Sequence, residues 1–378
     1  ALTELQFLIF YNLAEVKARL GKTADALEFL KRCFEIDERS LMSNLVLRPE
    51  AALTKLLNNR FNLYSLLVTL QLSGQLPESS VSEVFSRFLG RKGLALDIAC
   101  QMTAAQNALI HDENIASKLQ EIQQLRIWLA ELSVTGVEVE EQQLADDGMK
   151  FVPNRQTKTV LRIQELQEQV ALAIRGAGLQ LQLTGVDVEQ IRGKLAPRSA
   201  LIEFVVSGLI DLKDPASRVG DDPHLLAFFL PSDTTRACRL VDLGRMKDIN
   251  DQIEKLRGHI ERVPRSLRFM SEEELESQYQ ELSSNLYRHL LQPFDAELSN
   301  LENLVIAPDG QLHFIPFAAL NRANGHYLVE DLAISCVSSG RDLLRENAAP
   351  GRGTLVLADP DYDATRKERI TTAKSLGI

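Results

Sequence analysis

Cysteine is scarce in this sequence. The chain has 378 residues and four cysteines. None of them belongs to a Cys-x-x-Cys pair or lies near a histidine at the spacing of a metal site. A disulfide framework and a cysteine-based zinc site are therefore excluded, and we expect a reducing, cytoplasmic compartment. The four cysteines are Cys33, Cys100, Cys238 and Cys336.

Long apolar runs and an excess of basic residues are also missing. No stretch of eighteen apolar residues occurs, so the sequence predicts no membrane span. The first residues alternate polar and apolar side chains at helical spacing, which is not the pattern of a signal peptide. A net charge of −10 argues against a surface dedicated to nucleic acid, which needs clustered Lys and Arg.

The amino-terminal part has the periodicity of helices. Residues 1–38 place small or apolar side chains where two antiparallel helices would meet, with Gly21 at the turn between them. The pattern resembles one TPR repeat, although any helical hairpin would also produce it. A single repeat cannot bury its own apolar face, so neighbouring helices must stack on it. The small or apolar positions are Leu13, Ala14, Ala26, Leu30 and Cys33.

Further helical signals fill residues 39–150, without a clean 34-residue period, and predict a continuation of the α-solenoid. Residues 151–197 are expected to hold a connecting loop and a long helix from Lys158 to about Arg175. The polar and acidic composition between about Ser133 and Thr157 indicates the loop.

From residue 198 to residue 378 the periodicity changes to that of an α/β domain. Two helices are expected, from Met246 to about Ile260 and from Ser271 to about Leu291. Short apolar runs on both sides of these helices predict strands, and strands interleaved with helices indicate an α/β sheet. The runs are "ALIEFVV", "LLAFFLP", "ACRLVDLG", "LVIAPDG", "LHFIPF", "LAISCVSS" and "GTLVLADPDYD".

The stretch "LVIAPDGQLHFIPFAAL" combines a strand signal, a turn and a histidine. Pro308-Asp309-Gly310 predicts a turn in which the glycine takes a positive φ. The run after it is expected to be the partner strand or the next strand, with Leu312, Phe314 and Phe317 as apolar bulk and Pro316 ending the pairing. His313 has no partner for catalysis nearby in the sequence, so we expect it to face solvent or make a local hydrogen bond.

The same stretch carries a family resemblance. Ala307–Leu320 resembles the recurring "APDG-x-L-x-x-(Leu/Ile)-P-F-x-A-L" feature of CHAT domains, and Tyr327, Leu328 and Glu330 resemble the "YL-x-E" step that follows it. CHAT domains are caspase-like and are associated with TPR repeats in bacteria. The resemblance implies an amino-terminal α-helical, TPR-like region followed by a partial caspase-like α/β domain.

The resemblance also implies a cysteine endopeptidase related to caspases and separase. In that family a histidine in a His-Gly step and a cysteine after a small residue form the catalytic dyad, downstream of the strand represented here by "LVLADPDY". This sequence has no His-Gly step, and Cys100 and Cys238, which follow alanine, lie too far upstream. Cys336 is expected to be a small buried residue. We therefore assign no catalytic residue, no cofactor-binding residue and no metal ligand, and we expect a fragment or an incomplete sequence that is inactive by itself.

Other readings of local motifs are weaker. "LVLADPDYDAT" places Asp359 and Asp361 as in haloacid-dehalogenase-type phosphotransferases, but Asp363 stands where Thr or Val is expected. As a calcium loop it lacks the glycine and the final glutamate, which Ala364 and Ile370 replace. "FLGRKGLALD" lacks the spacing of a phosphate-binding loop and predicts a turn between helices.

By resemblance, the function is that of a TPR-CHAT protein of bacterial defence or cell death, whose helical region binds a protein partner or activator. A protein substrate is expected if the full-length chain is active, whereas a membrane or nucleic-acid partner is not. The alternative is a non-catalytic, TPR-type scaffold that binds a partner.

Overall fold

A computed structural model describes residues 2–45, 61–109, 111–135, 155–177, 185–217, 223–322 and 325–345. The chain divides into two compact units. The first unit comprises Ala1–Ser40, Lys55–Leu94 and Leu183–Arg345, and the second comprises Leu41–Thr54, Ala95–Gln182 and Glu346–Ile378. Residues 46–60, within the helical region expected over residues 39–150, and the expected strand "GTLVLADPDYD" lie outside the described residues.

The predicted amino-terminal hairpin is present in the first unit. Helix α1 (Leu2–Arg19) and helix α2 (Thr23–Leu45) are joined by a turn in which Gly21 has a φ of 69°. Phe10 and Phe29 stack across the pair with ring centroids 6.1 Å apart. The helical hairpin is thereby confirmed, whereas its assignment as a TPR repeat stays a prediction.

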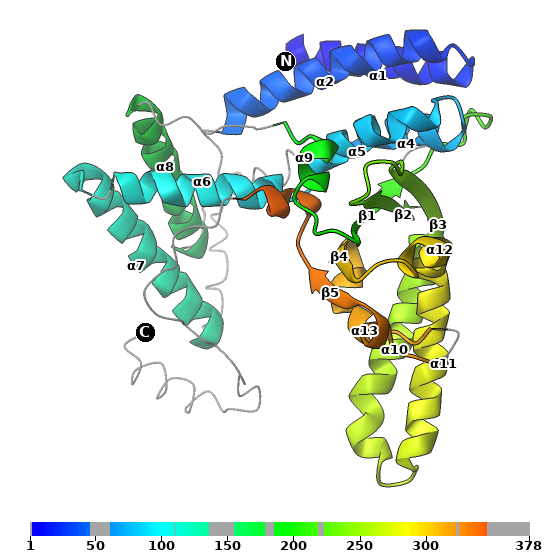
Figure 1. Ribbon diagram of the computed structural model, residues 1–378. Coiled ribbons are helices and arrows are strands. Elements are labelled where there is room, and N and C mark those ends of the chain that lie inside the picture. The colour runs from blue at the N-terminus through cyan, green and yellow to red at the C-terminus, as the bar shows by residue number, and fades with distance from the viewer. Residues whose placement is uncertain are drawn as a thin grey trace, which may run out of the picture. The chain divides into compact units, whose positions relative to one another are not determined.

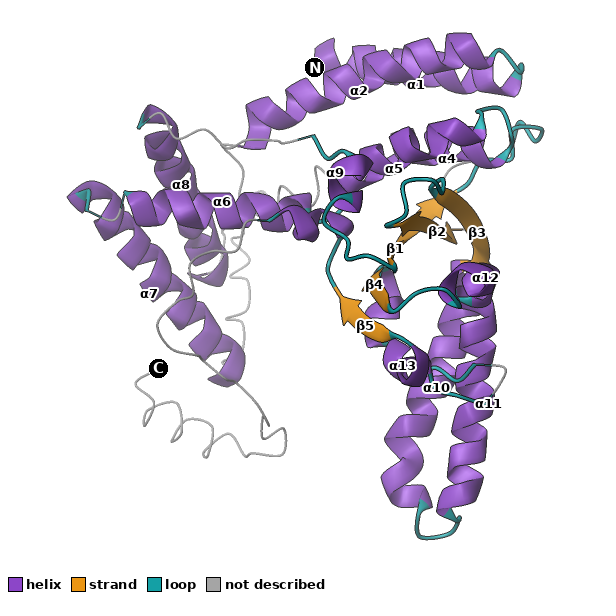
Figure 2. Cartoon of the chain, viewed as in Figure 1, coloured by secondary structure: helices purple, strands orange, loops and turns teal. Residues whose placement is uncertain are grey.

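The rest of the first unit is a sheet with helices on both faces (Figures 1 and 2). Helices come before the first strand, between the third and fourth strands and between the fourth and fifth, and short 3₁₀ turns follow the fourth and fifth strands. The helices are α4 (Phe61–Leu72), α5 (Val81–Leu89), α9 (Val188–Arg192), α10 (Met246–Ser266), α11 (Glu272–Leu290), α12 (Asp295–Leu298) and α13 (Leu328–Asp331), and the 3₁₀ turns are η1 (Glu78–Ser80), η2 (Gln292–Phe294), η3 (Gly310–Phe314), η4 (Phe317–Ala319) and η5 (Gly340–Leu344).

The sheet is mixed. The strands are β1 (Ser199–Gly208), β2 (Pro223–Pro231), β3 (Arg239–Arg245), β4 (Asn303–Ala307) and β5 (Ala333–Cys336). Their order is β3-β2-β1-β4-β5. The first three strands are antiparallel neighbours, and β1, β4 and β5 are parallel. Six of the seven strand signals thus fall in the described part, and five of them form the strands of this sheet.

"LHFIPF" is the sixth signal, and the prediction of a strand there was wrong. These residues form η3 and the start of η4 instead. Pro308 and Pro316 lack the N–H that a ladder needs, and Gly310 turns the chain at a φ of 55°. The apolar run therefore winds into two tight turns, which bury Leu312 and Phe317 but leave Phe314 56% exposed.

The two faces of β1 and β2 are buried by different helices. Side chains alternate between the faces of a strand, so Leu201 and Phe228 enter a core shared with α1, α2, α4 and α5, while Ile202 and Phe229 enter a core shared with α10 and α11. Burial on both faces explains why these strands are almost continuously apolar. The helical amino-terminal segment and the sheet thus share one hydrophobic core.

The second unit is helical. It contains α6 (Leu94–Ala108), α7 (Glu113–Thr135) and α8 (Arg155–Gly176). Helix α8 corresponds to the long helix predicted from Lys158, and it buries the stripe Ile163, Leu166, Val170 and Ile174 against α7. Among the described residues no helix is both long enough and apolar enough to cross a membrane.

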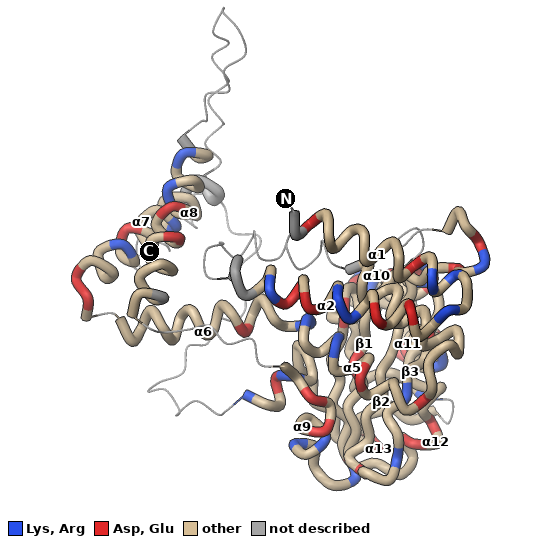
Figure 3. The backbone as a smooth tube through the Cα atoms, turned by 90° about the horizontal axis from the view of Figure 1, so that it is seen from above, with Lys and Arg blue, Asp and Glu red and all other residues tan. Residues whose placement is uncertain are grey.

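Charged residues of both signs are interspersed along the described helices (Figure 3). Several of them pair along or between helices, such as Arg32 with Glu28 and Arg162 with Glu121. Such mixing of charges along a helix is typical of helices that face solvent.

Candidate functional site

The carboxyl ends of the parallel strands β1, β4 and β5 lie at one edge of the sheet, where α/β proteins place their sites. Asp309 follows β4 there. Its carboxylate accepts hydrogen bonds from the backbone N–H of Gly310 at 2.9 Å and of Val206 at 2.8 Å. Asp309 therefore joins the ends of β1 and β4, and the predicted Pro308-Asp309-Gly310 turn is confirmed with its glycine at positive φ.

His313 lies in η3 on the far side of this turn. Its side chain is exposed, as the sequence predicted. Three other histidines are held by structural partners: His224 Nδ1 lies 2.9 Å from the Asp242 carboxylate, His259 Nε2 lies 3.0 Å from the Leu275 carbonyl, and His289 Nε2 lies 2.7 Å from the Leu243 carbonyl. These contacts fix imidazoles within the fold.

The cysteines near the sheet are not activated. Burial raises the pKa of the Cys238 thiol to about 12 and also raises the pKa of Cys336, whereas a nucleophilic cysteine needs a lowered pKa. Cys336 ends β5 and is exposed, so the prediction that it is buried was wrong. Among the described strands, β5 pairs only with β4.

A buried ion pair lies beneath the same edge. Glu203, on β1, is 1% exposed, and its Oε1 lies 2.9 Å from Nζ of Lys92 in the turn after α5. The other oxygen, Oε2, accepts the N–H of Gly340 at 2.6 Å, from the segment that follows β5. Burial raises the pKa of Glu203, and the Lys92 ammonium and the Gly340 N–H act in the opposite direction.

Sequence reasoning missed this pair. The available signals were a single glutamate inside the apolar run "ALIEFVV" and two basic residues between glycines in "GRKG". The second segment was expected to be a turn between helices, which is confirmed, since it joins α5 and α6. The contact between residues 111 positions apart cannot be read from either signal alone.

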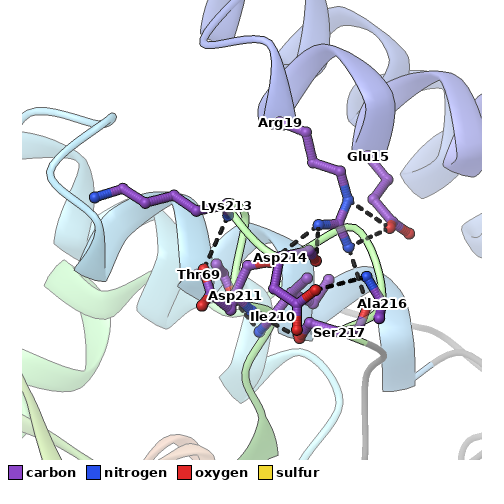
Figure 4. A network of polar contacts seen from close by, with 9 residues as sticks. All are labelled: Glu15, Arg19, Thr69, Ile210, Asp211, Lys213, Asp214, Ala216 and Ser217. Atoms are coloured by element: carbon purple, nitrogen blue, oxygen red, sulfur yellow. Dashed lines mark hydrogen bonds and ion pairs between the residues drawn. The ribbon is translucent and has the colours of Figure 1, made fainter.

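A second polar network ties α1 to the loop after β1 (Figure 4). The guanidinium of Arg19 donates to the carbonyls of Asp211 at 3.0 Å, Asp214 at 2.7 Å and Ser217 at 3.0 Å. Glu15 accepts two hydrogen bonds from the same guanidinium and fixes its orientation. The first helix of the hairpin is thus attached to the sheet by specific polar contacts as well as by the shared core.

An open groove of about 500 Å³ lies between α10 and α11. The Leu243 carbonyl can only accept, so His289 carries its proton on Nε2 and accepts from the Gln252 amide at Nδ1, at 3.0 Å. The groove contains no cysteine, and its histidine is fully engaged, so it lacks the parts of a cysteine peptidase centre. Its lining residues are Gln252, Lys255, Leu282, Asn285, Arg288 and His289.

No metal centre emerges from the described residues, which contain no group of three or more His, Cys, Asp or Glu side chains placed to hold an ion. The acids of the "LVLADPDYDAT" segment lie outside the described residues.

Comparisons with known proteins identify the family. No curated protein matches the chain. The CHAT domain family model matches residues 280–376, which begin within α11 and include the "LVIAPDGQLHFIPFAAL" stretch, the Asp309 turn and β5. The resemblance found in the sequence is thereby confirmed for these residues, and the chain contains a CHAT domain match.

Proposed function

We propose that this chain forms the amino-terminal, regulatory part of a caspase-like cysteine endopeptidase. The observation that carries the proposal is the CHAT domain match, which covers β4, the Asp309 turn and β5. The His/Cys dyad is proposed to lie outside these residues, because the sequence contains no His-Gly step. The activated thiolate and the oxyanion-binding N–H groups would then come from the remainder of the caspase-like domain.

The helical segment is proposed to sense a protein partner or activator. The core that α1, α2, α4 and α5 share with β1 and β2 supports this role, as does the Arg19 network. A partner that displaces these helices would act directly on the sheet. We further propose a cytoplasmic, bacterial protein with a protein substrate and with no direct contact to membrane or nucleic acid; a part in defence rests on family analogy alone.

Cysteine labelling of the natural protein, as its gene encodes it, tests the proposal. An electrophilic thiol probe is expected to label a cysteine that is not among the four of this sequence. A peptide aldehyde, which occupies the active site, should prevent that labelling. The gene should encode a His-Gly step followed by Ala-Cys or Ser-Cys, and changing that cysteine to alanine should remove both labelling and cleavage.

The second candidate is a non-catalytic scaffold that binds a partner through its helices; the raised pKa values of Cys238 and Cys336 agree with both candidates, because neither assigns chemistry to these cysteines. Labelling confined to the exposed Cys100 and Cys336, with no aldehyde-sensitive site and no encoded dyad, would establish the scaffold and overturn the peptidase.

A further inference from the structure

The turn Gly90–Gly93 sends two basic side chains in opposite directions. It follows α5, and its sequence is Gly-Arg-Lys-Gly. Arg91 reaches the helical hairpin and Lys92 reaches the sheet. Two neighbouring residues therefore connect α2, which the proposed function assigns to partner sensing, with the carboxyl edge of the CHAT sheet.

Arg91 holds α2 and α4. Its guanidinium forms an ion pair with Asp37 of α2, whose side chain is 3% exposed. Its Nε donates to the Tyr64 hydroxyl of α4 at 2.8 Å. A buried charge is stable only with such partners. Moving α2 away from Arg91 would leave the guanidinium or the Asp37 carboxylate without its partner, which costs free energy.

Lys92 holds the sheet. Its ammonium group has three N–H donors, and three acceptors surround it: Glu203 Oε1 at 2.9 Å, the Phe204 carbonyl at 2.8 Å and the Ala307 carbonyl at 3.1 Å. Ala307 is the last residue of β4, immediately before the Pro308-Asp309-Gly310 turn. Lys92 thus fixes the end of the β1–β4 ladder.

Glu203 also binds the segment Ser338–Arg341 after β5, because its Oε2 accepts a hydrogen bond from the Gly340 N–H. This segment also contacts the turn directly, since Arg341 donates to the carbonyls of Leu89 and Gly90, each at 3.3 Å. The contact leaves no space: Gly93 has a φ of 75°, and a Cβ there would lie 3.3 Å from Cδ of Arg341. Close packing of this kind transmits displacement because interiors are dense and stiff.

We propose that the Gly90–Gly93 turn is a mechanical link by which the position of α2 sets the position of Ser338–Arg341 and of the β4 end. Lys92 and Glu203 are positioning residues in this link, and they regulate the carboxyl edge without touching substrate. The inference rests on the proposed function for its biological meaning. The link itself is a property of the described residues and can be measured without any cleavage reaction.

Hydrogen exchange of the full 378-residue chain, followed by mass spectrometry, tests the link. Tyr64→Phe removes only the hydroxyl that orients Arg91, and Asp37→Asn removes the charge. Each is expected to raise the exchange rate of the Ser338–Arg341 amides at least fivefold. Glu38→Gln is the matched control, because Glu38 is 63% exposed and pairs with Arg87 instead; it should leave these amides unchanged.

A double variant shows whether the substitutions at Tyr64 and Glu203 act through one link or independently of each other. Glu203→Gln alone should accelerate the same amides, and adding Tyr64→Phe should accelerate them no further if both act through one link. Exchange increases confined to α2 and α4, or rates that multiply in the double variant, would overturn the proposal. Tyr64→Phe keeps the test decisive if Glu203→Gln proves too unstable to purify. If the natural protein cleaves no peptide, the proposed peptidase function is wrong. The hydrogen-exchange result for the Gly90–Gly93 turn does not depend on that outcome.

Discussion

At the carboxyl edge of the sheet, the space around Gly340 is too small for a larger side chain. A Cβ at this position would lie 2.5 Å from Cδ2 of Leu201 and 3.0 Å from Oε2 of Glu203. Gly340→Ala should therefore lower the free energy of unfolding by about 1–3 kcal/mol, as overpacking of a core does. Urea unfolding measures the change.

The control for that substitution is Gly185→Ala in the same unit. No atom lies within 4 Å of a Cβ built at Gly185. The free energy of unfolding should change by less than about 0.5 kcal/mol. Equal losses in the two variants would contradict the close packing of Gly340.

Cys238 gives the first unit a defined response to alkaline pH. Burial raises the pKa of its thiol from 9.0 to about 12, so the folded protein keeps a proton that the unfolded chain releases. The unfolded state then binds fewer protons, and stability must fall as pH rises from 9 to 12, by up to about 1.4 kcal/mol per pH unit for this one group. Urea midpoints between pH 8 and 11 should show the decline.

Cys238→Ala should make that decline shallower. Part of it should remain, because burial also raises the pKa of Tyr279 to about 12. An unchanged slope in the alanine variant would show that the thiol is not responsible.

Individual residues differ in how well the sequence predicts them. Gly21 and Gly310 were predictable because a turn of positive φ has few alternatives to glycine. The burial of Cys336 was predicted wrongly because a small side chain in a short apolar run was taken as buried, and burial depends on what covers the run. Lys92 and Glu203 could not be paired, since nothing local to either residue indicates the other.

At the level of elements, a stacked pair of aromatic rings joins α5 to β2. Phe85 and Phe228 stack with ring centroids 4.6 Å apart and an interplanar angle of 7°, and both are fully buried. Phe228→Ala should cost about 3–5 kcal/mol in the free energy of unfolding.

Phe314→Ala provides the comparison, because that ring is exposed and contacts mainly the Arg257 guanidinium, 4.5 Å from its centroid. Its loss should cost less than about 1 kcal/mol. Similar losses in the two phenylalanine variants, measured by urea unfolding, would show that α5 does not depend on the sheet for its packing.

Elements with strong periodicity were predictable, and elements defined by turns were not. The positions of β1 and β2 follow from their apolar runs, and those of α10 and α11 follow from helical stripes, although α10 continues to Ser266 and not only to about Ile260. "LHFIPF" has the composition of a strand, yet its flanking prolines and glycine direct it into 3₁₀ turns. The domain boundaries expected at residues 38, 150 and 197 stay predictions.

In the molecule as a whole, one hydrophobic core and two polar networks join the amino-terminal helices to the mixed sheet, of which β4 and β5 lie within the CHAT match. The Arg19 network holds the β1–β2 loop, and the Gly90–Gly93 turn holds the β4 end and the segment after β5. The sequence could predict the family from its motifs. It could not predict these connections, because they depend on contacts between segments more than 100 residues apart.

The proposed peptidase is best tested by incubating a peptide library with the natural protein, with and without proteins that bind its amino-terminal helices. We expect cuts at a defined sequence, a rate that depends on a bound partner, and no cuts when the dyad cysteine is changed to alanine. Absence of any cleavage in the presence of the bound partner, or cleavage that survives the alanine variant, would contradict it.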